Sequence, residues 1–74
     1  LIRELERAVQ GARKAAGLKV GEEVSLFIDT QDEEFKSALK MFDKKKTYIK
    51  EIKFEPGLVG EVLIIEGKEI VFKL

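Results

Sequence analysis

Apolar residues near the start of the chain recur at steps of three and four positions, which is the spacing of one face of an α-helix. This apolar stripe consists of Ile2, Leu5, Val9, Ala12 and Ala16. Gly17 follows the last apolar position, where a glycine adopts the left-handed conformation that ends many helices. Residues 24–29 then alternate strictly, which predicts a half-buried strand. Its apolar face consists of Val24, Leu26 and Ile28.

A second helical stripe begins near position 35. It is formed by Phe35, Ala38, Leu39, Phe42 and Ile49. Thr30 and Glu33 have the spacing of a capping box, in which two side chains satisfy free backbone N–H groups at the start of a helix. The polar run 43–47 interrupts the stripe, so one long helix and two short helices both fit this segment.

The last third of the chain predicts strands rather than helices. Residues 51–55 read as a short strand, and a Pro-Gly turn separates them from 59–65, a strand too apolar to be exposed on both faces. A Glu-Gly pair, typical of a tight hairpin turn, joins this strand to 68–74. We therefore expect a β-hairpin at the end of the chain.

The order helix, strand, helix, strands predicts an α+β fold with two layers. We expect a mostly antiparallel sheet of about four strands, with two or three helices on one face. The 74 residues suffice for a single small domain, 1–74, that folds independently. Its predicted core consists of Leu5, Val9, Val24, Leu26, Ile28, Phe35, Leu39, Ile64 and Phe72.

The composition excludes several classes of protein. With 45% apolar and 38% charged residues, the chain is too apolar to be disordered and too charged to span a membrane. It has no cysteine and no histidine, which removes thiol nucleophiles, the usual general base and most zinc ligands. We therefore expect a cytoplasmic domain with no catalytic residues, no metal site and no cofactor of its own.

The charges are segregated, although the formal net charge is zero. Residues 1–20 contain five basic and two acidic side chains, and residues 36–53 contain seven lysines and two acidic side chains. Residues 21–34 contain six acidic side chains and no basic one. Basic surface is therefore expected despite the neutral total.

Each candidate binding feature also has an ordinary structural interpretation. The lysines at 44–46 suit nucleic-acid phosphates, but equally a solvated face. Phe27 and Tyr48 are able to stack on unpaired bases, although such aromatic residues are more often part of a core. The acidic run 29–34 lacks the ligand spacing of a calcium loop and suits a helix N-terminus. The glycines of 57–60 have the spacing of the KH-domain RNA clamp, but here a turn is favoured.

A more specific pattern runs through the first helix and strand: Arg3-Glu4-Leu5, Arg7, Gln10, Arg13-Lys14, Gly17-Leu18, Val20, then Val24, Leu26 and Ile28. In this order the residues resemble the C-terminal region of isoleucyl-tRNA synthetases, especially those of the archaeal and eukaryotic-like branch. Ala8 and Gly11 depart from it, since the family commonly has a basic and a bulkier residue there. The segments 48–50 and 65–70 are similar to the same region more diffusely. The catalytic signatures of the family, His-Ile-Gly-His and Lys-Met-Ser-Lys-Ser, are absent.

The resemblance implies a fragment of a larger enzyme, a ligase that joins isoleucine to its tRNA in protein biosynthesis and uses ATP and magnesium. This chain would be a non-catalytic C-terminal domain appended beyond the anticodon-binding helices. Its expected partners are tRNA and the remainder of the synthetase, with neither DNA nor a membrane.

The expected tRNA contacts are electrostatic and fall on the basic residues of the two positive segments. They are Arg3, Arg7, Arg13, Lys14, Lys44, Lys45, Lys46 and Lys50. The alternative hypothesis is a structural module that docks on the rest of the synthetase or on another protein, without RNA contact.

Overall fold

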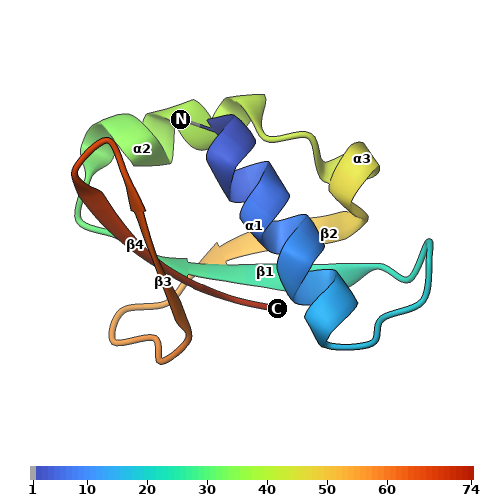
Figure 1. Cartoon of the computed structure of the whole chain (residues 1–74). Coiled ribbons are helices and arrows are strands. Elements are labelled where there is room, and N and C mark those ends of the chain that lie inside the picture. Colours follow the sequence, from blue (N-terminus) through green and yellow to red (C-terminus); the bar gives the residue numbers. More distant parts are fainter. Residues whose placement is uncertain (1) are drawn as a thin grey trace.

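The computed structural model describes residues 2–74, which form a four-stranded sheet and three α-helices (Figure 1). In chain order the elements are α1 (Ile2–Ala15), β1 (Val24–Asp29), α2 (Glu33–Ala38), the 3-10 helix η1 (Leu39–Met41), α3 (Lys44–Thr47), β2 (Ile49–Phe54), β3 (Glu61–Ile65) and β4 (Lys68–Lys73). The predicted α+β class is confirmed. The interrupted second stripe is divided into short helices, but Ile49, expected on that stripe, begins β2 instead. Within this range no helix has both the length and the apolar character needed to cross a membrane.

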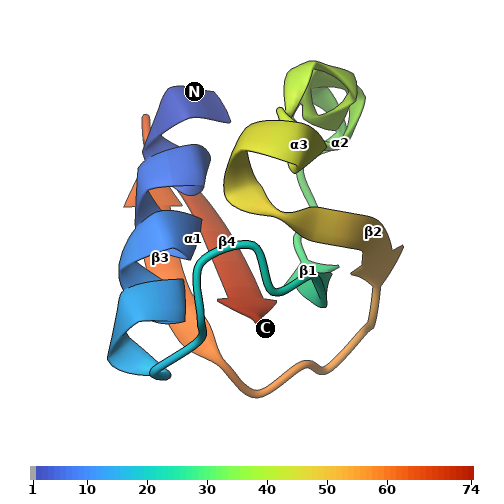
Figure 2. The same ribbon diagram turned by 90° about the vertical axis from the view of Figure 1, so that its right-hand side faces the viewer.

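The strands are arranged in the order β2-β1-β4-β3. β1 pairs with β2 in parallel, whereas the β1–β4 and β3–β4 pairs are antiparallel. The parallel pair arises because the helices between β1 and β2 carry the chain back along the sheet. β2 and β3 therefore lie at opposite edges, and residues 55–60 cross from one edge to the other (Figure 2).

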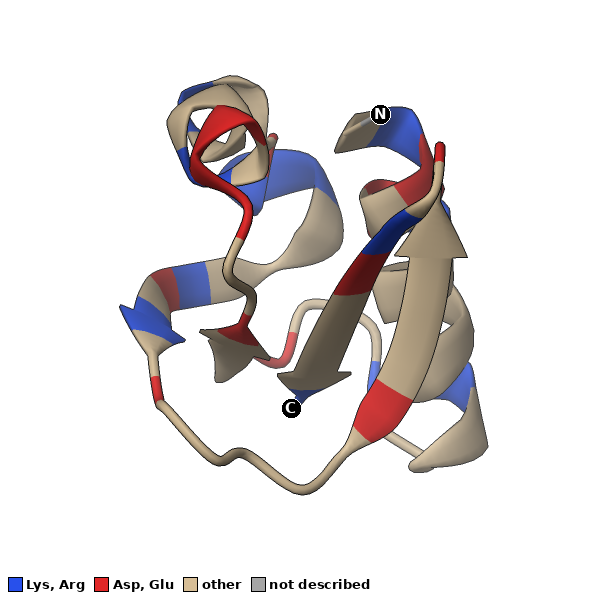
Figure 3. Ribbon diagram, turned by 90° about the vertical axis from the view of Figure 1, so that its left-hand side faces the viewer, with Lys and Arg blue, Asp and Glu red and all other residues tan. Residues whose placement is uncertain are grey.

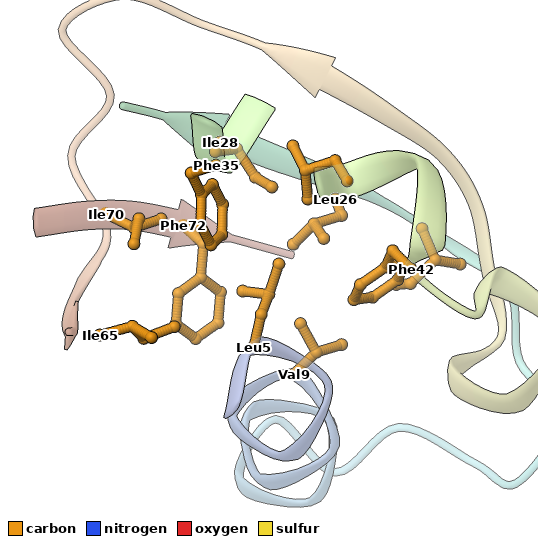
Figure 4. Packing of buried hydrophobic residues seen from close by; sticks show 11 residues of the cluster. Leu5, Val9, Leu26, Ile28, Phe35, Phe42, Ile65, Ile70 and Phe72 are labelled. Atoms are coloured by element: carbon orange, nitrogen blue, oxygen red, sulfur yellow. The ribbon is translucent and has the colours of Figure 1, made fainter. Parts of the chain in front are cut away.

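The helices cover one face of the sheet, and the core lies between the two layers (Figure 4). Alternate residues of the central strands point into it, so that Leu26 and Ile28 of β1 and Ile70 of β4 are fully buried. Leu5 and Val9 project from α1 into the same cluster. The apolar side chains buried there are Leu5, Val9, Leu26, Ile28, Phe35, Leu39, Phe42, Ile49, Ile65, Ile70 and Phe72.

α1 ends as the sequence predicts. Gly17 has a φ of 72°, and its N–H donates to the carbonyl of Lys14 at 3.1 Å. The N–H of Leu18 donates to the carbonyl of Arg13, also at 3.1 Å. These two bonds form a Schellman motif, which satisfies carbonyls that have no partner within the helix.

The predicted capping box at Thr30 and Glu33 is wrong. α2 begins at Glu33 with Asp32 as its N-cap, and the Asp32 carboxylate accepts the N–H of Phe35 at 2.7 Å. The hydroxyl of Thr30 accepts the N–H of Asp32 at 3.2 Å and lies 3.4 Å from the carbonyl of Glu69, to which it donates. Thr30 thus joins the start of α2 to β4, because the helix begins too late for Thr30 to cap it.

The predicted burial of Ile64 is also wrong, since its side chain is 69% exposed. Leu63 pairs with the buried Ile70, so Leu63 and Ile65 face the helices while Ile64 points to the uncovered face. A continuous apolar run does not indicate which alternate residues face inward. Val24, at the start of β1, is only half-buried.

Candidate nucleic-acid interface

A basic groove runs between α1 and α3, which lie side by side. The two helices are joined by a hydrogen bond of 2.9 Å from the N–H of Asp43 to the Glu6 carboxylate. The groove has two adjoining hollows that share Gln10 and Lys46. The first, of about 280 Å³, is lined by Arg3, Glu6, Arg7, Gln10 and Lys46.

The second hollow, here called the helix-end pocket, lies where α1 and α3 both end. Its volume is about 300 Å³. It is lined by Gln10, Arg13, Lys14, Leu18, Lys19, Val20, Lys46, Thr47 and Tyr48. Among residues 2–74 the charged side chains that line this pocket are Arg13, Lys14, Lys19 and Lys46, all of them basic.

Arg13 is the most buried cation of the groove. Its side chain is only 8% exposed, and its Nη2 donates to the carbonyl of Lys19 at 3.2 Å. The guanidinium carbon lies 5.6 Å from the centre of the Tyr48 ring, within cation–π range. Nη1 is buried and has no hydrogen-bond partner in the described part of the chain. A buried guanidinium with an unmatched donor is uncommon and calls for an acceptor.

Tyr48 holds an unusual backbone conformation beside Arg13. It ends α3 with φ 54° and ψ 43°, in the left-handed region that a bulky residue rarely adopts. Its N–H donates to the carbonyl of Lys45 at 3.3 Å, and its side chain remains 39% exposed. The ring therefore contacts Arg13 and is still accessible from the pocket.

The fold brings together only some of the basic residues predicted from the sequence. Lys46 joins the predicted residues of α1, namely Arg3, Arg7, Arg13 and Lys14. Lys44 and Lys45 are exposed on α3 but line neither hollow, and Lys50 is exposed at the start of β2. Figure 3 shows basic residues on both helices of the groove and acidic residues at the start of α2.

Gln10 and Lys19 were missed as binding candidates, as were the apolar residues Leu18 and Val20 of the same pocket. The Schellman turn at Gly17 reverses the chain and places Lys19 beside the last turn of α1. Gly17 predicts this turn from the sequence, but it does not predict which side chain after the turn lines the pocket. Arg13 is not one of the five apolar residues of the predicted stripe, yet it is buried against Tyr48.

The other candidate features have structural roles in the fold. Gly60 has no room for a side chain, because a Cβ would meet the backbone carbonyl of Phe72. Asp32 caps α2, and the N–H of Phe35, with the ammonium of Lys68 at 3.4 Å, holds the Asp32 pKa below its ordinary value. Residues 2–74 contain no cluster of acidic side chains arranged to hold a metal ion. Phe27 lies half-buried on β1, away from the groove.

Comparison of the sequence with protein-family models and with curated proteins finds no match. The resemblance to isoleucyl-tRNA synthetases therefore stays a hypothesis. The functional assignment rests on the geometry and charge of the groove.

Proposed function

We propose that this chain is a non-catalytic RNA-binding domain that holds tRNA phosphates in the basic groove, as the C-terminal appendage of an isoleucine-tRNA ligase. The observation that supports the proposal is the charge of the groove. Its cationic side chains are Arg3, Arg7, Arg13, Lys14, Lys19 and Lys46. Its one acidic side chain, Glu6, already accepts the N–H of Asp43.

Five of these cations are exposed and so accessible to a polyanion, whereas Arg13 is buried. Arg7 interacts electrostatically with Glu4 one turn before it, and no ion pair is found for the other five among residues 2–74. RNA phosphates bind such side chains and release condensed counterions, whatever the base sequence. The ligation of isoleucine, with its ATP and magnesium, belongs in this proposal to the rest of a cytoplasmic parent enzyme.

Titration of labelled tRNA at several salt concentrations tests the groove. Replacing Arg3, Arg7 and Lys46 by alanine removes three charges that line it, and we expect weaker binding together with a salt slope lowered by about one unit per lost phosphate contact. The matched control replaces Lys44, Lys45 and Lys50, which carry the same charge outside the groove. Equal losses in the two triple variants would show that the groove has no special role.

Docking on a protein is the second candidate function, and a different observation favours it. Val62 and Ile64 of the edge strand β3 are 61% and 69% exposed, and Val59 before it is 87% exposed. Exposed apolar side chains on a sheet edge suit contact with another chain. A domain that binds no tRNA even at low salt would favour docking, since an apolar interface changes little with salt.

A further inference from the structure

We infer that the helix-end pocket binds one unpaired nucleotide, with its phosphate against Arg13 and its base against the ring of Tyr48. The inference rests on the proposed function and narrows it, because it names single-stranded RNA as the ligand of this part of the groove. In this proposal the groove binds duplex RNA only through the phosphate backbone.

The phosphate half of the site has three exposed lysines around the buried guanidinium of Arg13, one of whose nitrogens is unmatched. Nη2 of Arg13 is already used by the Lys19 carbonyl, whereas Nη1 has no acceptor among residues 2–74. Phosphate oxygens are strong acceptors for guanidinium, and the bond is charge-assisted. Lys14, Lys19 and Lys46 line the same pocket, and the Glu22 carboxylate lies beside it, where it accepts the backbone N–H of Lys19 at 3.2 Å.

The base half is apolar and aromatic. Tyr48 presents an accessible ring, and Leu18 and Val20 line the pocket with it. Val20 is 96% exposed, so its side chain is accessible to a ligand at the pocket. A base has a flat apolar face that stacks on an aromatic ring, and such stacking tolerates any sequence.

The size of the pocket favours a single unpaired nucleotide over a duplex. A volume of about 300 Å³ lies at the small end of pockets that enclose a ligand. In a duplex the bases are stacked on one another and do not reach a side pocket, whereas those of loops and ends are free to splay out. The left-handed conformation of Tyr48 fits this role, since backbone strain concentrates at ligand sites.

Tyrosine fluorescence provides a direct test, because Tyr48 is the single tyrosine and the chain has no tryptophan. The probes are a short single-stranded ribo-oligonucleotide, the same sequence in a duplex, AMP and adenosine. We expect the single strand to quench Tyr48 and to bind more tightly than the duplex, and AMP to quench at lower concentration than adenosine. Quenching by AMP with none by the single strand would assign the pocket to a free nucleotide and overturn its role in RNA binding.

Two variants at position 48 separate stacking from general charge. Tyr48→Gly removes the ring and relieves the left-handed strain, so the variant is expected to fold, whereas Tyr48→Phe keeps a ring. Measured by anisotropy of labelled RNA, the preference for single strand over duplex should fall roughly tenfold in Tyr48→Gly and persist in Tyr48→Phe. If the wild-type protein and both variants bind single-stranded and duplex RNA equally, the nucleotide site in the pocket is contradicted, while RNA binding in the groove is not. No binding of either RNA at low salt would defeat both.

Discussion

At the scale of single residues, two glycines in the first part of the chain have opposite backbone requirements. Gly11 lies inside α1, where an added Cβ would meet no atom within 4 Å. Gly17 has the same free space but a φ of 72°. We expect Gly11→Ala to stabilise the domain by about 0.5–1 kcal/mol through helix propensity. Gly17→Ala should destabilise it by about 1 kcal/mol, because alanine is strained in the left-handed region.

Urea unfolding followed by circular dichroism measures both effects. The substitutions add the same methyl group, so the sign of the change isolates the backbone conformation. A stabilising Gly17→Ala would contradict the Schellman end of α1.

Asp32 should make the stability of the domain sensitive to acid. Its pKa lies below the ordinary value of 3.8, first because its carboxylate accepts the N–H of Phe35 and also because Lys68 is near. A lowered folded-state pKa contributes stability that is present above the unfolded pKa and lost as the pH falls through the folded pKa. We therefore expect this contribution to begin to fall near about pH 4 and to disappear only below the folded-state pKa.

Asp32→Asn is the matched variant, since asparagine caps a helix about as well but does not titrate. The wild-type domain should be more stable than Asp32→Asn at neutral pH, and this advantage should vanish in acid. Thermal unfolding of both proteins from neutral pH to about pH 2 measures the difference. A constant difference across that range would show that Asp32 does not titrate with folding.

At the scale of elements, β1 and β3 provide a test of which strand face is buried. Leu26 of β1 is fully buried, so Leu26→Ala should cost about 2–5 kcal/mol. Ile64 of β3 is 69% exposed, so Ile64→Ala should change the free energy of unfolding by only about 0.5 kcal/mol. Chemical denaturation measures the free energy of unfolding of both variants. A larger loss in Ile64→Ala than in Leu26→Ala would contradict the strand orientations.

The same two strands show how far the sequence predicts an element. β1 alternates apolar and other residues, so both its existence and its buried face follow from the pattern. β3 is part of a continuous apolar run, and its inner face is set only by the register that pairs Leu63 with Ile70. The sequence also left open whether residues 35–49 form one helix. The structure has separate short helices there, because Asp43 caps α3 by accepting the N–H of Lys46 at 2.9 Å.

At the scale of the whole molecule, the sequence predicted two basic segments but not the surface that they share. The packing of α1 against α3 selects Lys46 for the groove and leaves its neighbours Lys44 and Lys45 outside. Helix packing depends on contacts between residues far apart in the chain, which periodicity does not reveal. The Arg13–Tyr48 contact of the candidate site was unpredictable for the same reason.

The position of β4 in the sheet has a consequence for synthesis of the chain. β4 follows the other three strands of the sheet in the chain, yet it lies between β1 and β3. The apolar face of β1 therefore cannot be fully enclosed until the ribosome has added residues 68–73. At roughly 5–20 residues per second, the nascent chain carries an unpaired edge of β1 for several seconds. During that interval the edge of β1 that β4 later covers is exposed to other chains.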